Sequence, residues 1–88
     1  MGRNEIKKFF GAAVRQRRGR LGISQEELAG RAGLHRTYIS DVERGARNVS
    51  LESIHRLAGA LDMPMSQLFS WHHAGLEHEK EAKVNSHG

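Results

Sequence analysis

An arginine and two hydroxyl residues are spaced so that a helix would place them on one side. Arg36 and Thr37 are adjacent, and Ser40 follows one helical turn later. A guanidinium can donate two hydrogen bonds to O6 and N7 of a guanine, and a threonine methyl group can contact that of thymine. We predict base contacts for these three residues, with Arg36 as the main reader. A phosphate contact is the alternative for Arg36.

The charge of the 88-residue chain is unevenly distributed. Its formal net charge is +4. Residues 1–23 carry seven basic residues against Glu5 alone, which gives +6, whereas residues 24–88 sum to −2. A basic face suits a nucleic acid or an anionic membrane, although a solvated basic helix is a common alternative. We expect Arg15, Arg17 and Arg20 to add background attraction for a polyanion.

Composition and motifs argue against several classes of protein. The chain has no cysteine, which excludes disulfides and thiolate metal sites. No apolar run approaches the ~18 residues of a membrane span, so we expect a soluble, cytoplasmic protein that does not bind membranes. His72, His73 and His78 are not spaced to stack ligands on one helix face, and neither a metal nor a cofactor is predicted. Since the chain has no cysteine nucleophile, no P-loop and no dinucleotide motif, no enzymatic activity is expected.

Apolar residues recur every three or four positions, which predicts an all-α fold. Five helices are expected, at residues 5–21, 25–32, 36–44, 51–61 and from about 64–66 onward. Ser24 and Glu27 form a capping box for the second helix. The apolar stripes of the first and fourth helices are expected to include Ile6 and Leu51, respectively. Gly11 should weaken the first helix by about 1 kcal/mol relative to alanine.

The second and third helices have the pattern of two short helices that cross closely. Ala29 is small where one helix presses on the other, and Gly33 permits a tight turn. Ile39 and Val42 are expected to pack inward and so hold the second of the two helices in place. This is the geometry of a helix-turn-helix, whose second helix lies in the major groove of DNA.

The same residues carry a family resemblance. The runs 23–29 (ISQEELA), 32–34 (AGL) and 38–45 (YISDVERG) resemble the phage repressor and Cro-type (XRE) helix-turn-helix family. The resemblance covers residues 10–70 and implies a compact five-helix bundle, a lambda-repressor-like DNA-binding domain. Within it, runs 36–40 (RTYIS) and 43–48 (ERGARN) resemble the controller proteins of restriction–modification systems. Those are small homodimeric activators and repressors of their own operon, and similar runs occur in other small regulators.

The resemblance and the helix positions predict contacts to the DNA backbone. A glutamine like Gln25 bonds a phosphate in the family, and a helix N-terminus favours that anion. His35 stands at an N-cap where Ser, Thr, Asp or Asn is usual, and it either contacts phosphate or caps poorly. For Tyr38 a place in the core is an equal alternative, and for Asn48 a turn through its own backbone is favoured. The predicted set is Gln25, His35, Tyr38, Arg44, Arg47 and Asn48.

Two acidic residues near the end of the third helix need separate explanations. Arg18 and Glu43 resemble the internal ion pair of the family, which ties the first helix to the recognition helix. Because burying charges costs desolvation, we expect the pair to orient the two helices more than to stabilise the fold. Asp41 would repel phosphate. It either bonds a base amino group or restrains Arg36 or Arg44, and the sequence leaves both alternatives open.

A single helix in one groove reads few base pairs, so we expect a homodimer on a pseudo-palindromic operator. Met65, Phe69 and Trp71 are predicted at the dimer interface, with Leu68 in the monomer core. Residues 1–74 are expected to form the DNA-binding domain, and residues 75–88 a flexible polar tail.

Two functions are consistent with these features. The first is a sequence-specific regulator that binds double-stranded DNA, with RNA polymerase as a further partner if it activates. The second is an antitoxin-type protein that also neutralises a protein partner. The short polar tail favours the first, because an antitoxin usually needs a longer segment that folds on its target.

Overall fold

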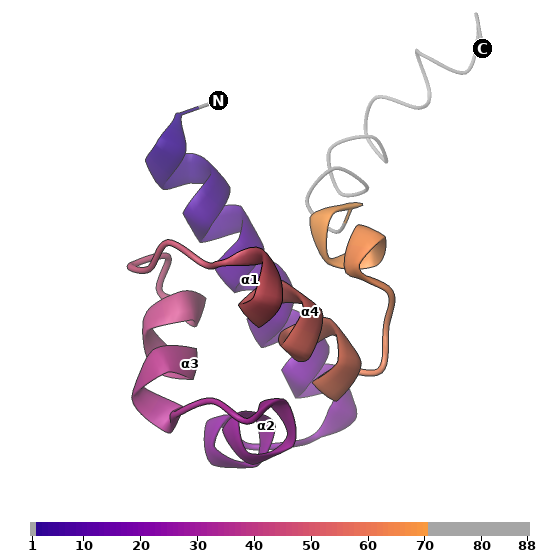
Figure 1. Cartoon of the computed structure of the whole chain (residues 1–88). Helices are drawn as coiled ribbons and strands as arrows, with labels where there is room; N and C mark the ends of the chain where they lie inside the picture. Colours follow the sequence, from indigo (N-terminus) through magenta and orange to yellow (C-terminus); the bar gives the residue numbers. More distant parts are fainter. Residues whose placement is uncertain (1, 71–88) are drawn as a thin grey trace, which may run out of the picture.

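One long helix forms the base on which the shorter helices pack. The computed structural model describes residues 2–70. The helices are α1 (Arg3–Leu21), α2 (Gln25–Ala32), α3 (Arg36–Glu43) and α4 (Leu51–Ala60), and a further helical segment covers residues 65–70. Figure 1 shows α1 running behind α4, with α2 and α3 at its lower end and left side. The predicted all-α fold with five helical segments is confirmed.

Local signals in the sequence set the helix ends. The Ser24 hydroxyl accepts a hydrogen bond from the Glu27 N–H at 3.0 Å. The Glu27 side chain instead pairs with Arg31 at 2.7 Å, so one half of the predicted capping box is present. Gly33 ends α2 with φ of 69°, a left-handed conformation that favours glycine. The first helix begins two residues earlier than predicted, where the Gly2 N–H donates to Glu5 Oε1 at 2.9 Å.

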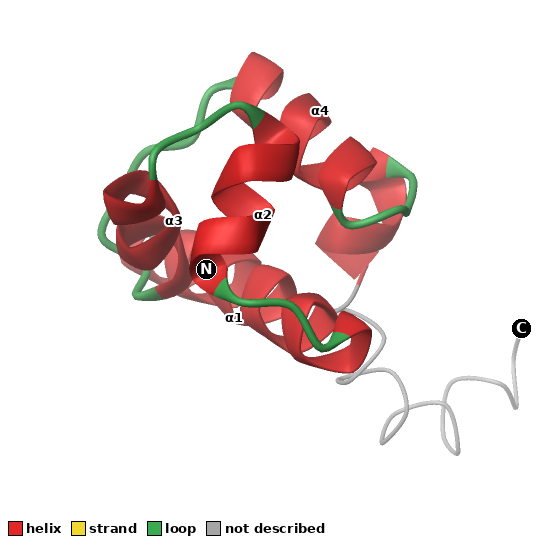
Figure 2. Ribbon diagram, turned by 90° about the horizontal axis from the view of Figure 1, so that it is seen from below, coloured by secondary structure: helices red, strands yellow, loops and turns green. Residues whose placement is uncertain are grey.

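The apolar core lies where the helices meet. Helix α3 packs on both α1 and α2, and α2 also packs on α4; Figure 2 shows α2 between the other two short helices. Every labelled helix contributes to one buried cluster, and Leu68 joins it from the segment 65–70. The largest fully buried side chains are Leu28, Ile39, Leu57, Leu61, Leu68, Val14 and Val42.

Two residues assigned to apolar stripes are exposed instead. Ile6 is 46% exposed because it lies in the first turns of α1, which project beyond the other helices in Figure 1. Leu51 is 75% exposed. It directly follows the N-cap Ser50, and the inward side of α4 begins only at Ile54. Both predictions of burial were therefore wrong.

Candidate nucleic-acid interface

Helix α3, the predicted recognition helix, has an inner and an outer side. Ile39 and Val42 are 0% and 1% exposed and fix the inner side in the core. Arg36 and Thr37 are exposed in its first turn, and Ser40 lies half-buried one turn later. The three predicted base-contacting residues therefore occupy one side of one helix and face solvent together.

Helix α3 is held close to α1 by backbone packing. A Cβ atom on Gly11 would lie 2.1 Å from the carbonyl oxygen of Val42 and 2.9 Å from that of Glu43. Gly45 follows α3 with φ of 74°, and a Cβ there would lie 2.9 Å from the Cα atom of Lys8. Gly11 was predicted only to weaken α1, and its role in this contact was missed. A glycine inside a helix, away from any turn, was the available signal.

An ion pair locks the same junction. Arg18 Nε and Nη2 donate to the two carboxylate oxygens of Glu43 at 2.7 and 3.1 Å, and Arg18 Nη1 donates to the Ile23 carbonyl oxygen at 2.9 Å. The side chains are 19% and 4% exposed. The hydrogen bond and charge of Glu43 raise the pKa of Arg18 above its ordinary value, although burial opposes this shift. The pair joins α1 to the end of α3.

Gln25 belongs to this ion-pair network. Its amide Nε2 donates to Glu43 Oε1 at 3.0 Å, a contact that sequence reasoning did not foresee. An amide nitrogen carries two N–H groups, so a contact with phosphate would use the second. The network thus fixes the amide at the start of α2, where the positive end of the helix dipole favours an anion.

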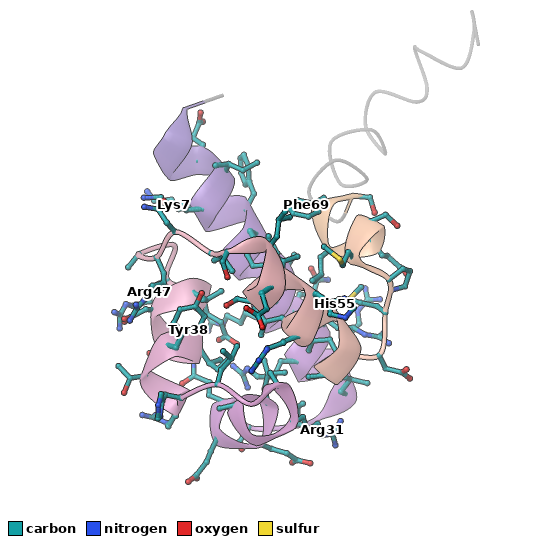
Figure 3. The ribbon with its side chains drawn as sticks, in the orientation of Figure 1. Lys7, Arg31, Tyr38, Arg47, His55 and Phe69 are labelled. Carbon is teal, nitrogen blue, oxygen red and sulfur yellow. The ribbon has the colours of Figure 1, made fainter. Side chains whose placement is uncertain are left out.

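A second polar cluster lies on the outer side of α3. The Asp41 carboxylate pairs with Arg44 through one oxygen and with Arg47 through the other, the latter at 3.1 Å. The Arg47 guanidinium lies 4.7 Å from the centre of the Tyr38 ring, and Figure 3 shows the two side chains beside α3. Of the alternatives for Asp41, the structure shows restraint of Arg44, with Arg47 as an additional partner.

The N-cap of α3 and the following loop hold the remaining predicted residues. The exposed His35 side chain makes no cap hydrogen bond to the described residues of α3. Asn48 is exposed in the loop before α4. Both therefore face solvent, and their contacts to the DNA backbone stay predictions.

Arg17 has structural partners that the sequence did not predict. Its Nε donates to the Leu61 carbonyl oxygen at 2.9 Å, and its Nη2 donates to the Asp62 carbonyl oxygen at 3.2 Å. A cation that bonds the last carbonyl groups of a helix stabilises its negative end. Arg17 therefore caps the end of α4 and keeps its charge, so its background attraction for a polyanion stays a prediction, as does that of the exposed Arg15 and Arg20.

Comparison with known proteins decides the family. A helix-turn-helix family model matches residues 14–68, which include α2, α3 and α4. The chain belongs to the XRE-type helix-turn-helix family. It is a DNA-binding transcriptional regulator, as the sequence predicted.

Several relatives of this XRE-type protein have names that describe their role. The control protein C.BamHI of Bacillus amyloliquefaciens is 48% identical over 69 residues, which cover 77% of this chain and 85% of the relative. The control protein C.SmaI of Serratia marcescens is 42% identical over 76 residues, 86% of this chain and 88% of the relative. The restriction–modification controller protein C.AhdI of Aeromonas hydrophila has a similar structure, with a TM-score of 0.75 and 45% identity over 78% of this chain and 100% of that chain.

Apolar residues are exposed on the side of this XRE-type protein formed by α1, the loop before α4 and the segment 65–70. Ile6 and Phe69 line a hollow there, and Phe69 is 46% exposed. The Phe69 ring also packs on Phe10, with the ring centres 5.6 Å apart. Met65 is half-buried, whereas Leu68 is buried as predicted.

Other predictions for this protein concern residues outside the described part. Trp71, His72, His73, His78 and the predicted tail 75–88 lie beyond residue 70. Within residues 2–70, no three histidine or acidic side chains come together as metal ligands would. No helix in the same range has the length and apolar character needed to cross a membrane.

Proposed function

We propose that the protein is a homodimeric controller that binds a pseudo-palindromic operator and regulates its own restriction–modification operon. The observation that carries this proposal is the rigidly held α3, whose outer side presents Arg36, Thr37 and Ser40 to solvent. The similarity of the chain to restriction–modification control proteins supports the choice of operon. The protein would act in the cytoplasm without cofactor or enzymatic activity, and it would contact RNA polymerase if it activates transcription.

In this proposal the helix-turn-helix reads bases from its centre and binds phosphates at its edges. The first turn of α3 would enter the major groove, where Arg36 reads guanine and Thr37 contacts thymine. Backbone contacts would come from both ends of the motif: from Gln25 and His35 before α3, and from Tyr38, Arg44, Arg47 and Asn48 along and after it. These contacts would fix the register in which the base-reading side chains meet the groove.

Two copies are needed to read a complete operator. In homodimeric proteins with this motif, the recognition helices meet half-sites about 34–36 Å apart. The exposed apolar side chains around the Phe69 hollow support an interface there, because exposed aromatic residues lose unfavourable contact with water when a second copy covers them. Met65, Phe69 and Trp71 are the proposed interface residues.

Arg36→Ala tests the base-reading role. We expect wild-type protein to select a two-fold symmetric motif from randomised duplex DNA at moderate salt. The variant should select the same motif with one position relaxed in each half, because one good bidentate pair contributes about 1–3 kcal/mol of discrimination. High-throughput sequencing of the selected duplexes measures both results.

Other outcomes of this selection separate the alternatives. If Arg36→Ala weakened binding equally at all sequences, Arg36 would be a phosphate contact, and base reading would fall to Thr37 and Ser40. If wild-type protein enriched no motif despite salt-sensitive binding, the proposal of a specific regulator would be wrong. The antitoxin-type function, with a protein partner, would then be favoured.

Phe69→Glu tests the proposed interface. The variant should raise the dimer dissociation constant by at least about tenfold, because an unpaired carboxylate would have to be desolvated between the two copies. Sedimentation velocity over a concentration series measures the change. Gly19→Glu adds the same charge at an exposed position near the C-terminal end of α1, where an added side chain meets open space, and it should leave the constant nearly unchanged. Equal sedimentation of Phe69→Glu and wild-type protein would place the interface elsewhere.

A further inference from the structure

Asp41 carries a negative charge on the side of α3 that meets DNA in the proposed function. It lies one helical turn after Thr37, and its side chain is 21% exposed. A carboxylate in this position repels phosphate and should weaken binding to every sequence alike. Its presence therefore needs a reason other than affinity.

The contacts of Asp41 join the loop after α3 to the helix at three points. Its backbone carbonyl oxygen accepts a hydrogen bond from the Ala46 N–H at 2.9 Å. One carboxylate oxygen accepts a hydrogen bond from Arg44, and the other accepts one from Arg47 at 3.1 Å. Both oxygens of a single side chain are thus used to hold two arginines.

Arg47 is held on a second side by an aromatic ring. Its guanidinium lies 4.7 Å from the centre of the Tyr38 ring, a cation–π arrangement. Tyr38 is itself packed against the core, so the ring is a fixed support. Figure 3 shows the labelled Tyr38 and Arg47 close together beside α3. A flexible loop arginine is thereby given one direction relative to the recognition helix.

We propose that Asp41 is a positioning residue that determines sequence specificity by holding Arg44 and Arg47 in fixed directions. This inference rests on the proposed function. A mobile arginine can bond phosphates of any duplex in many registers, whereas a held arginine bonds a phosphate only in the register that places the base-reading side chains in the groove. Repulsion by the carboxylate lowers the affinity for every duplex, and operator DNA offsets this loss through the base contacts made in that register. Asp41 therefore lowers nonspecific binding more than operator binding.

Asp41→Asn tests the inference, because it preserves shape while removing the charge and one acceptor. The dissociation constants are measured for the operator selected by wild-type protein and for a scrambled duplex of equal length, over a salt series. Affinity for the scrambled duplex should rise about threefold to tenfold. Its log–log salt dependence should steepen by about 0.9 to 1.8, as one or two more phosphates are contacted. The ratio of operator to scrambled affinity should fall at least about threefold.

Two further variants separate positioning from net charge. Glu27→Gln removes a carboxylate from the exposed pair with Arg31, which lies away from Tyr38 and Arg47 in Figure 3. It should leave the affinity ratio unchanged. Arg47→Lys keeps the charge but loses the planar group held between Asp41 and Tyr38, so it should lower the ratio as Asp41→Asn does. Thermal melting followed by circular dichroism checks that each variant is folded.

The outcomes distinguish this inference from the proposed function. If wild-type protein prefers its operator and Asp41→Asn changes both affinities by one common factor, as Glu27→Gln does, Asp41 acts through charge alone and the inference is overturned. An unchanged ratio in Arg47→Lys would also overturn it, because the direction of Arg47 would then not matter. If wild-type protein shows no operator preference, the proposed function and the inference fail together.

Discussion

Gly11→Ala should remove about 3 kcal/mol or more from the free energy of unfolding. The added Cβ atom would lie 2.1 Å from the Val42 carbonyl oxygen, so α1 and α3 would have to move apart. Inserting even one methylene into a well-packed core costs about 1–3 kcal/mol, and here the obstacle is backbone. The gain of about 1 kcal/mol in helix propensity cannot offset this loss. Urea denaturation followed by far-ultraviolet circular dichroism measures the change.

Gly19→Ala is the matched control in the same helix. No heavy atom in residues 2–70 outside the local backbone lies within 4 Å of a Cβ atom built at Gly19. This substitution should stabilise the protein by about 0.5–1 kcal/mol, since alanine loses less backbone entropy than glycine on forming a helix. If the two variants had equal stability, close packing of α1 on α3 would not explain the glycine at position 11.

Glu43→Ala should have the second large effect, a loss of about 3 kcal/mol. The substitution leaves the Arg18 guanidinium partly buried without its carboxylate partner, and removing one member of a buried ion pair costs about 3–5 kcal/mol. The lower end applies because Arg18 is 19% exposed and retains the Ile23 carbonyl oxygen. Gln25 would lose its acceptor as well. The same urea denaturation measures this loss.

Two comparisons show whether burial causes the Glu43 effect. Glu43→Gln keeps the side-chain volume and one acceptor, so the loss should be smaller, about 1–2 kcal/mol. Glu52→Gln breaks an ion pair with Arg56 whose side chains are 74% and 46% exposed, and it should change stability by less than about 1 kcal/mol. A loss in Glu52→Gln as large as in Glu43→Ala would contradict the argument.

Features encoded by neighbouring residues were predictable from the sequence. The bounds of α2 were predicted without error, because Ser24 and Gly33 act within one turn of the helix that they limit. The inward positions of Ile39 and Val42 followed from helical spacing alone. The resemblance also suggested the partnership of Arg18 and Glu43, which are 25 positions apart.

Contacts between distant elements were not predictable, because composition and spacing do not show which surfaces meet. The sequence predicted only that Gly11 lowers the stability of α1. Its role in close packing depends on α3 lying against it. In the sequence, Arg15 and Arg17 are both basic residues that lie off the apolar stripe of the first helix. Of these two, only Arg17 reaches the end of α4. The exposure of Leu51 likewise depends on where the inward side of α4 begins.

The division of α3 into an inner and an outer side has an evolutionary consequence. The inner residues Ile39, Val42 and Glu43 hold the helix in place, whereas the outer residues meet solvent. In the proposed function, substitutions at Arg36 or Thr37 would therefore change the preferred target with little loss of stability. After gene duplication, substitutions at a few surface positions would give one copy a different DNA target. The two proteins would then bind separate sites while keeping the same fold.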